Sequence, residues 1–420
     1  MGDAAIWGSG TVTASDYCAW TVTNIRAGLI ACMVTLSGGC AVSAFQQPEQ
    51  FDARYLRKRA ESVVEDSIRV SAAVPGREES AAIFGIDLSE KNVQPVWVEI
   101  ENNSGRSVYF LKTGLDPEYF SPREVAFAFY GSLSEEGKKH LVEHIEGLHF
   151  RDPIDPHTTV SGFVFTNSDR ETKFVSVDLL SPGWSTHLVL LTPIPEGSLT
   201  DNKIETILTM IAQATPLQVN DESGLRTLLE KLPCCSSDEH GVQSEPLNVV
   251  LIGELEATGA ALTRRRFRYA PATSRYVFGR AQDLSLKKGN RWVAAQPHVL
   301  RVWLTNMRYR EKLVWIGQIS TTLGGRFAST ASDESPIVIE PDVDETRNDL
   351  VQDAIYSQQV SEIGFVKGVG SVTRSSPRTT PSGSTYHTDG LRAVMFFDRD
   401  PVSLSELEFI SWERLIDHQH

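Results

Sequence analysis

The C-terminal half of the chain contains histidine, carboxylate and arginine side chains that could do chemistry. The candidates are Arg280, Asp283, His298, Arg301, Asp342, Asp344, Arg347, His387 and Asp389. A histidine with two or three carboxylates can bind a divalent cation or act as a general base, and arginines can hold a phosphate group through paired hydrogen bonds. One hypothesis is therefore a hydrolase that uses His298 and the Asp342/Asp344 region, with Arg280 as an anion clamp.

Structural roles explain the same residues. Asp342 and Asp344 lie in the first turn of an expected helix, where capping and the helix dipole favour carboxylates. Arg280 with Asp283, and Arg347 with Asp344, have the spacing of local ion pairs. The sequence contains no nucleophile elbow, zinc-ligand spacing or phosphate-binding glycine loop. We therefore expect a binding module without metal or cofactor, and a hydrolase of phosphorylated or lipidic envelope substrates is the alternative.

The elements that must position these residues are strands mixed with helices. The pattern predicts strands at 248–253, 276–278, 299–304, 313–319, 365–369 and 391–397, and helices at 254–264 and 343–363. Asp342 and Glu345 have capping spacing at the start of the second helix, and Gly364 follows its expected end. These elements predict a mixed α/β (α+β) domain over residues 247–400, followed by a tail at 401–420.

The preceding part of the chain predicts an antiparallel β-sandwich over residues 63–195, so the protein is expected to be multidomain. Alternating strands are expected at 68–72, 96–100, 108–111, 162–166, 174–180 and 187–192. A helical insertion is expected from Ser121 to about 130 and again at 135–145. Residues 41–62 are interpreted as a tether with a short helix. Residues 196–246 are interpreted as a helical and polar linker, exposed and open to proteases near 233–246, so that residues 245–420 would fold alone.

Charge is divided unevenly between the two halves. Residues 41–245 contain 18 Lys and Arg against 32 Asp and Glu, a net charge of −14, whereas residues 246–400 contain 20 against 16, a net charge of +4. This acidity argues against nucleic-acid binding. Seven basic residues could face anionic lipid or could be a solvated helix end. They are Arg264, Arg265, Arg266, Arg268, Lys287, Lys288 and Arg291.

Several motifs of the C-terminal half are shared with a known family. They are Tyr276-Val-Phe-Gly-Arg280-Ala-Gln-Asp283-Leu, Val314-Trp-Ile-Gly-Gln-Ile319, Pro341-Asp-Val-Asp344-Glu-Thr-Arg347, Val366-Lys-Gly-Val-Gly370 and Thr388-Asp-Gly-Leu-Arg392. This segment resembles the LssY-type C-terminal domain, a bacterial family often joined to multi-pass membrane proteins of the phosphatidic-acid-phosphatase type. The sandwich part resembles the domain that precedes it in secreted members. The resemblance implies an architecture and an envelope location, and it implies no reaction.

The N-terminal segment has features of a lipoprotein leader. Residues 27–38 are apolar or small, which suits a signal-peptide core, and no apolar run reaches the ~18 residues of a membrane-spanning helix. Leu36-Ser-Gly-Gly-Cys40 resembles a bacterial lipobox, in which Cys40 would carry the diacylglyceryl group. We therefore expect residues 1–40 to be a signal peptide, and the mature protein to be held at the periplasmic face of a bacterial membrane through Cys40. An envelope protein or anionic lipid would be its partner. A buried N-terminal helix is the alternative.

The remaining cysteines give no metal-ligand spacing. Cys18 and Cys32 lie in the segment expected to be removed, which leaves the adjacent pair Cys234 and Cys235. Neighbouring cysteines rarely bridge each other, because a trans peptide holds their Cα atoms about 3.8 Å apart. We interpret the pair as loop thiols.

The segment before Arg26 lacks the cationic residues of a signal-peptide start and contains Trp7, Tyr17 and Trp20. We therefore predict that translation begins near Val22. Mass spectrometry of the uncleaved precursor checks this, and a peptide that covers Trp7 would contradict it.

Overall fold

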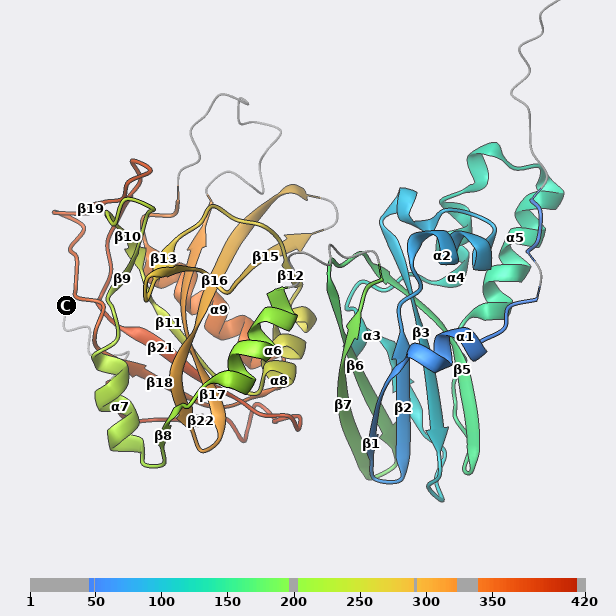
Figure 1. Cartoon of the computed structure of the whole chain (residues 1–420), viewed down its shortest axis with the longest axis horizontal. Helices are drawn as coiled ribbons and strands as arrows, with labels where there is room; N and C mark the ends of the chain where they lie inside the picture. Colours follow the sequence, from blue (N-terminus) through green and yellow to red (C-terminus); the bar gives the residue numbers. More distant parts are fainter. Residues whose placement is uncertain (1–44, 49, 196–202, 291–292, 323–338, 414–420) are drawn as a thin grey trace, which may run out of the picture. The chain divides into compact units, whose positions relative to one another are not determined.

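The sandwich domain consists of two antiparallel sheets packed on one apolar core (Figure 1). The computed structural model describes residues 45–48, 50–195, 203–290, 293–322 and 339–413, so the predicted leader and Cys40 lie outside the described residues. The strands are β1 Glu61–Glu65, β2 Ile68–Ala73, β3 Val93–Asn102, β4 Tyr109–Leu111, β5 Thr158–Asn167, β6 Thr172–Ser181 and β7 Trp184–Pro193. Their orders are β1-β2-β3-β5 and β4-β6-β7. The predicted sandwich is confirmed.

Helices cover the outer face of the first sheet. They are α1 Arg54–Arg59, α2 Arg77–Phe84, α4 Pro122–Phe127 and α5 Glu135–Leu148, while the short α3 Lys112–Leu115 lies beside β6. Ser121 caps α4 as predicted, because its hydroxyl accepts a hydrogen bond from the Glu124 N–H at 3.2 Å. Trp97 of β3 is fully buried in a second core with Phe163 and Phe165. Strand β3 is therefore apolar on both faces, because a sheet covers one face and helices cover the other.

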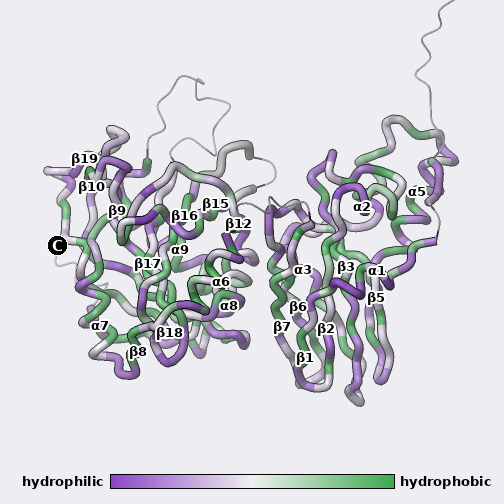
Figure 2. Tube along the Cα trace, in the orientation of Figure 1, coloured by the Kyte–Doolittle hydropathy of each residue, from purple (hydrophilic) through white to green (hydrophobic). Residues whose placement is uncertain are grey.

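The C-terminal domain is built on a nine-stranded mixed sheet. Its path is β12-β15-β16-β17-β11-β21-β18-β22, and β8 pairs with β16. The bounds are β8 Leu217–Val219, β11 Val249–Gly253, β12 Phe267–Tyr269, β15 Leu284–Asn290, β16 Val293–Tyr309, β17 Lys312–Thr321, β18 Val360–Val366, β21 Arg392–Phe397 and β22 Glu408–Phe409. Figure 2 shows apolar residues along the central strands. The central strands β11 and β21 run parallel and are completely buried.

Both faces of this sheet are covered. Helices α6 Lys203–Gln213, α8 Leu255–Arg264 and α9 Val343–Tyr356 contribute to the core on one face. Helix α7 Glu222–Glu230 and the small sheet β10-β9-β13-β14 pack on the other face. The small strands are β9 Cys235–Ser237, β10 Gln243–Pro246, β13 Tyr276–Val277 and β14 Arg280–Ala281, and a further hairpin joins β19 Arg378–Thr379 to β20 Thr385–Tyr386. The domain is thus three-layered, in agreement with the predicted mixed α/β class.

Two sequence-based assignments need correction, and a third segment adds a strand that the sequence did not predict. Residues 233–246 are not simply a linker, because they contribute β9 and β10 and bury Ser236, Ser244 and Glu245, whereas the turn at 239–242 is exposed as expected. Helix α9 ends at Tyr356 instead of 363, since Val360–Val366 pairs with β21 as a strand. The tail contributes β22, and Trp412 packs on Phe396. Each error has one cause: tertiary pairing recruited a segment whose local pattern is ambiguous.

The basic run joins the C-terminal domain to the acidic sandwich. Arg264 pairs with Asp178 at 2.6 Å, and Arg268 lies 2.9 Å from both Asp116 and Asp169. Residues 42–420 accordingly form one compact unit. The expectation that residues 245–420 fold alone also conflicts with the core, because α6 and α7 lie before residue 245 and cover the sheet.

We predict that acid destabilises the fold through these carboxylates. Burial alone would raise the pKa of Asp169, but Lys173 and Arg268 outweigh it and lower that pKa. Burial would also raise the pKa of Asp178, but the contacts with His187 and Arg264 outweigh burial and lower that pKa. A lowered folded-state pKa gives stability that is present above the unfolded value of about 4 and is lost as the pH falls through the folded value. Urea unfolding between pH 7 and pH 3 should therefore show a falling midpoint. Asp178→Asn should flatten that fall, and an unchanged slope would contradict the assignment.

Candidate functional site

The candidate residues lie in four separate places of the C-terminal domain. Arg280 and Asp283 lie beside Leu304 of β16, Arg301 lies next to the small sheet, and His298 lies between the large sheet and α9. The others lie at the start of α9 and in the turn before β21: Asp342, Asp344, Arg347, His387 and Asp389. The structure therefore brings the last group together and does not bring all the candidates into one pocket.

Arg280 and Asp283 form a structural clamp. Their side chains make a bidentate ion pair at 3.0 and 2.9 Å. Arg280 also donates to the Leu304 carbonyl at 2.6 Å, and Asp283 accepts from the Leu304 N–H at 2.6 Å. The pair thereby fixes the loop after β14 to strand β16, and the polar atoms of Asp283 are used in doing so.

Arg301 is buried in a polar layer between the two sheets. Its Nε donates to the Thr273 carbonyl at 3.2 Å, and nearby Arg275 pairs with Glu245 at 3.1 Å. Burial lowers the pKa of Arg301 to about 10, against the attraction of Glu245. No described group accepts from Arg301 Nη1 or from the Nε2 of Gln318, although both atoms are buried. Both atoms lack solvent access in this structure.

His298 is tied to helix α9 through two threonines. Its Nδ1 lies 2.8 Å from the Thr321 hydroxyl, which lies 3.0 Å from the Thr346 hydroxyl. The ring borders an open polar pocket of about 220 Å³, whose wall includes Arg265, Lys288 and Asp353. Asp353 accepts from both cations, at 3.1 and 2.5 Å. The two positive charges of this pocket are therefore engaged with a common carboxylate.

The start of α9 is fixed by a buried arginine. Arg347 is 1% exposed and donates to both carboxylate oxygens of Asp389, at 2.9 and 3.0 Å, and to the Leu391 carbonyl at 3.0 Å. Asp344 accepts from the Thr388 hydroxyl at 2.7 Å and from the Asp389 N–H at 2.6 Å. Burial raises the pKa of Asp344 despite the nearby Arg347 charge. The carboxylates here hold a helix to a turn.

The outer residues of this group are less constrained. Asp342 caps α9 by accepting from the Glu345 N–H at 3.3 Å, and Arg374 lies 2.8 Å from its carboxylate. The nearest nitrogen of His387 is 4.0 Å from Asp342. Within the described ranges, no three His, Cys, Asp or Glu side chains are grouped so that they could hold a metal ion.

Arg392 is a residue that our sequence reasoning named in a motif but did not select as a candidate. Its guanidinium is completely buried and donates to five backbone carbonyl groups. They belong to Leu229, Leu232, Pro233, Leu247 and Gly368. An arginine that begins an otherwise apolar run, 392–397, was the available signal, because a charge in such a strand requires a dedicated set of partners.

One apolar cavity of the described structure is small. It has a volume of about 70 Å³ and is bordered by Phe174, Leu255, Val302 and Trp315. For comparison, an apolar cavity of roughly 150 Å³ binds benzene. The space is therefore too small for a lipid acyl chain without movement of its walls, and Trp315 is part of the hydrophobic core.

We predict that the Arg347 clamp is a stability determinant. Arg347→Met should lower the free energy of unfolding by about 3 kcal/mol, because Asp389 and Asp344 would stay partly buried without their cation. Arg374→Met is the matched control, since that side chain is exposed and its loss should cost less than about 1 kcal/mol. Equal urea midpoints for the two variants would contradict the prediction.

Comparison with known proteins agrees with the architecture. Residues 254–391 match the family model described as LssY C-terminus, and no curated protein matches the chain. The matched segment runs from α8 to the turn before β21 and contains the Arg280–Asp283 clamp and the Arg347–Asp389 clamp. Residues 254–391 of the second domain are therefore similar to the LssY C-terminus family, and this domain follows a β-sandwich.

Proposed function

We propose that this protein is a lipid-anchored module of the cell envelope, facing the periplasm, whose LssY C-terminal domain binds a partner and does not catalyse a reaction. The anchor rests on the sequence: an apolar segment at 27–38, a lipobox-like Leu36-Ser-Gly-Gly-Cys40 and a polar stretch that follows it. No helix in the described part of the chain is long and apolar enough to span a membrane.

One observation carries the proposal of a binding module. The polar residues of the family motifs form hydrogen bonds that hold segments of the fold together. Asp283 holds Leu304, Arg347 holds Asp389, and Arg392 holds a set of carbonyls. A catalytic group must keep an atom free within reach of a substrate. The motif residues therefore stabilise a defined surface of the domain. A fixed surface without free catalytic groups suits the binding of a partner.

The internal pairing of the basic run favours a protein partner over lipid headgroups. Five of the residues that could have faced anionic lipid have carboxylate partners within the chain: Arg264, Arg265, Arg266, Arg268 and Lys288. Positive charge that is already neutralised contributes little to binding an anionic surface. The remaining acidity of the sandwich would favour a partner with a basic surface.

We predict that Cys40 is the membrane anchor. Cys40→Ser should move the protein from the membrane pellet to the soluble fraction after a carbonate wash, because two acyl chains supply about 0.8 kcal/mol per buried methylene. Fractionation with immunoblotting measures this. Cys32→Ser in the same leader is the control and should leave the protein in the membrane. A Cys40→Ser variant that stays membrane-bound would overturn the anchor.

We also predict that the purified protein does not turn over phosphomonoester, phosphodiester or carboxylic ester substrates. The comparison is wild type against His298→Ala, since His298 is the general base that the hydrolase hypothesis requires. Chromogenic release should be equal for both proteins and at the buffer background. Turnover above background that His298→Ala abolishes would replace the binding proposal with the hydrolase.

A further inference from the structure

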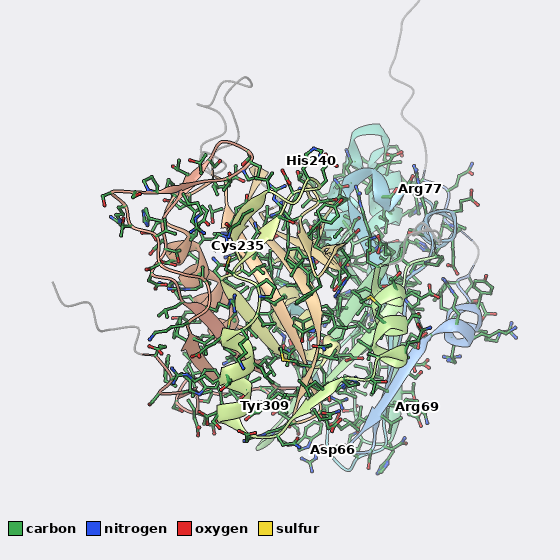
Figure 3. All side chains as sticks on the ribbon, turned by 60° about the vertical axis from the view of Figure 1, so that its left-hand side comes forward. Asp66, Arg69, Arg77, Cys235, His240 and Tyr309 are labelled. Carbon is green, nitrogen blue, oxygen red and sulfur yellow. The ribbon has the colours of Figure 1, made fainter. Side chains whose placement is uncertain are left out.

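The adjacent thiols Cys234 and Cys235 lie side by side at the start of strand β9 of the small sheet. Their Sγ atoms are 2.6 Å apart, and both residues are partly accessible to solvent. The side-chain amide of Gln243 on the neighbouring strand β10 lies 2.9 Å from one sulfur and 2.8 Å from the other. Figure 3 labels Cys235 on strand β9 and His240 in the following turn. The two thiols therefore share one niche and one hydrogen-bond donor.

Two arginines face this niche from different segments. Arg392 is completely buried, and the five hydrogen bonds that the structure gives its guanidinium all go to neutral carbonyl oxygens. Burial lowers the pKa of Arg392 to about 10, and the Cys234 and Cys235 sulfurs act in the opposite direction. Tyr386 raises the pKa of Arg378 in the β19–β20 hairpin, and the two sulfurs add smaller electrostatic contributions in the same direction. A buried cation favours negative charge on a neighbouring sulfur.

The two thiols are not equivalent. Burial and the adjacent Cys234 thiol raise the pKa of Cys235 to about 12, so Cys235 keeps its proton at neutral pH. Tyr386 lies beside Cys235, and burial followed by that thiol raises the pKa of Tyr386 to about 12. The raised pKa of Cys235 makes it the less reactive thiol, so we assign the second step to Cys235 and the first to Cys234.

We propose that Cys234 and Cys235 form a reversible thiol-oxidation site that reacts with small disulfides. The Cys234 thiolate attacks one sulfur of the small disulfide and releases one thiol, which leaves a mixed disulfide on Cys234. The Cys235 sulfur then displaces the second thiol and closes a bond to Cys234. Two protein thiols lose two electrons, the small disulfide gains them, and the two protons leave with the released thiols.

Reversibility follows from the geometry of neighbouring residues. Their Cα atoms are held about 3.8 Å apart by a trans peptide, closer than the 4.4–6.8 Å of a relaxed disulfide. A strained bridge is reduced more easily. Closing the ring must also disturb the Cys234 carbonyl, which accepts from the Leu247 N–H at 2.9 Å. Oxidation should therefore loosen the segment that holds Arg392.

The test uses the purified full chain and oxidised glutathione. The tryptic peptide 232–264 contains both thiols and no other cysteine, so peptide mapping isolates the site. We expect this peptide to lose the mass of two hydrogen atoms and to regain it with dithiothreitol. Glutathione adducts on both cysteines, an intermolecular disulfide or two unreacted thiols would each overturn the proposal.

Variants separate the two roles. Cys235→Ser should stop at the glutathione adduct on Cys234, and Cys234→Ser should leave Cys235 at least about tenfold slower to react. Equal rates for the two single variants would contradict the order of attack. Thermal melting of each variant, compared with wild type, identifies a folding defect, and wild-type iodoacetamide labelling gives the same order without any substitution.

The contribution of the Arg378 charge to thiol reactivity can be measured independently of the two cysteine variants. Arg378→Gln should slow alkylation of Cys234 about threefold, because it removes the more exposed of the two cations. Arg374→Gln is the matched control, since Arg374 is equally exposed in the preceding loop and pairs with Asp342. Slowing by both variants alike, or by neither, would contradict the role of Arg378.

Discussion

Two buried guanidinium groups, those of Arg347 and Arg392, hold the start of strand β21 at the centre of the large sheet. Arg347 holds Asp389 and the Leu391 carbonyl just before the strand, and Arg392 is the first residue of the strand itself. A buried cation is costly unless its hydrogen bonds are satisfied, so both side chains impose a definite arrangement on the segments around them. The position of β21 in turn determines how β11 and β18 pair on its two sides.

The same requirement organises the rest of the C-terminal domain. Arg392 gathers the end of α7, the loop before β9 and the turn after β18 by binding their carbonyl groups. Arg280 and Asp283 fix the loop after β14 to β16. Buried Asn248 bridges β17 and α9, because its side chain accepts from the Ile319 N–H and donates to the Val343 carbonyl. Polar residues that would be catalytic candidates in isolation thus serve to align backbone segments.

The charge division between the two domains has a structural use. Arg268 lies between Asp116 and Asp169, and Lys173 pairs with Asp169, in a network in which Asp116 and Lys173 are buried and Asp169 and Arg268 are half-buried. Networks of this kind are strongly destabilised by the loss of one member, because the others remain as unpaired buried charges. Phe174 adds an apolar contact, since it packs against Gly259 of α8 so closely that a Cβ at this position would overlap its ring. The sandwich therefore supplies part of the environment of α8.

The local sequence was sufficient for most elements. Alternating apolar residues predicted β2, β3 and β5 to β7, and the capping residues Ser121 and Asp342 correctly predicted where α4 and α9 begin, because these signals act within a few residues. The motifs shared with the LssY-type domain could also be recognised in the sequence. Local patterns could not predict that 360–366 would be a strand, that 235–246 would join a sheet, or that the basic run would meet the sandwich carboxylates. Those outcomes depend on partners far away in the chain. Only the tertiary structure decides whether a buried arginine or thiol has a partner, because the free-energy cost of an unpaired polar group depends on its burial.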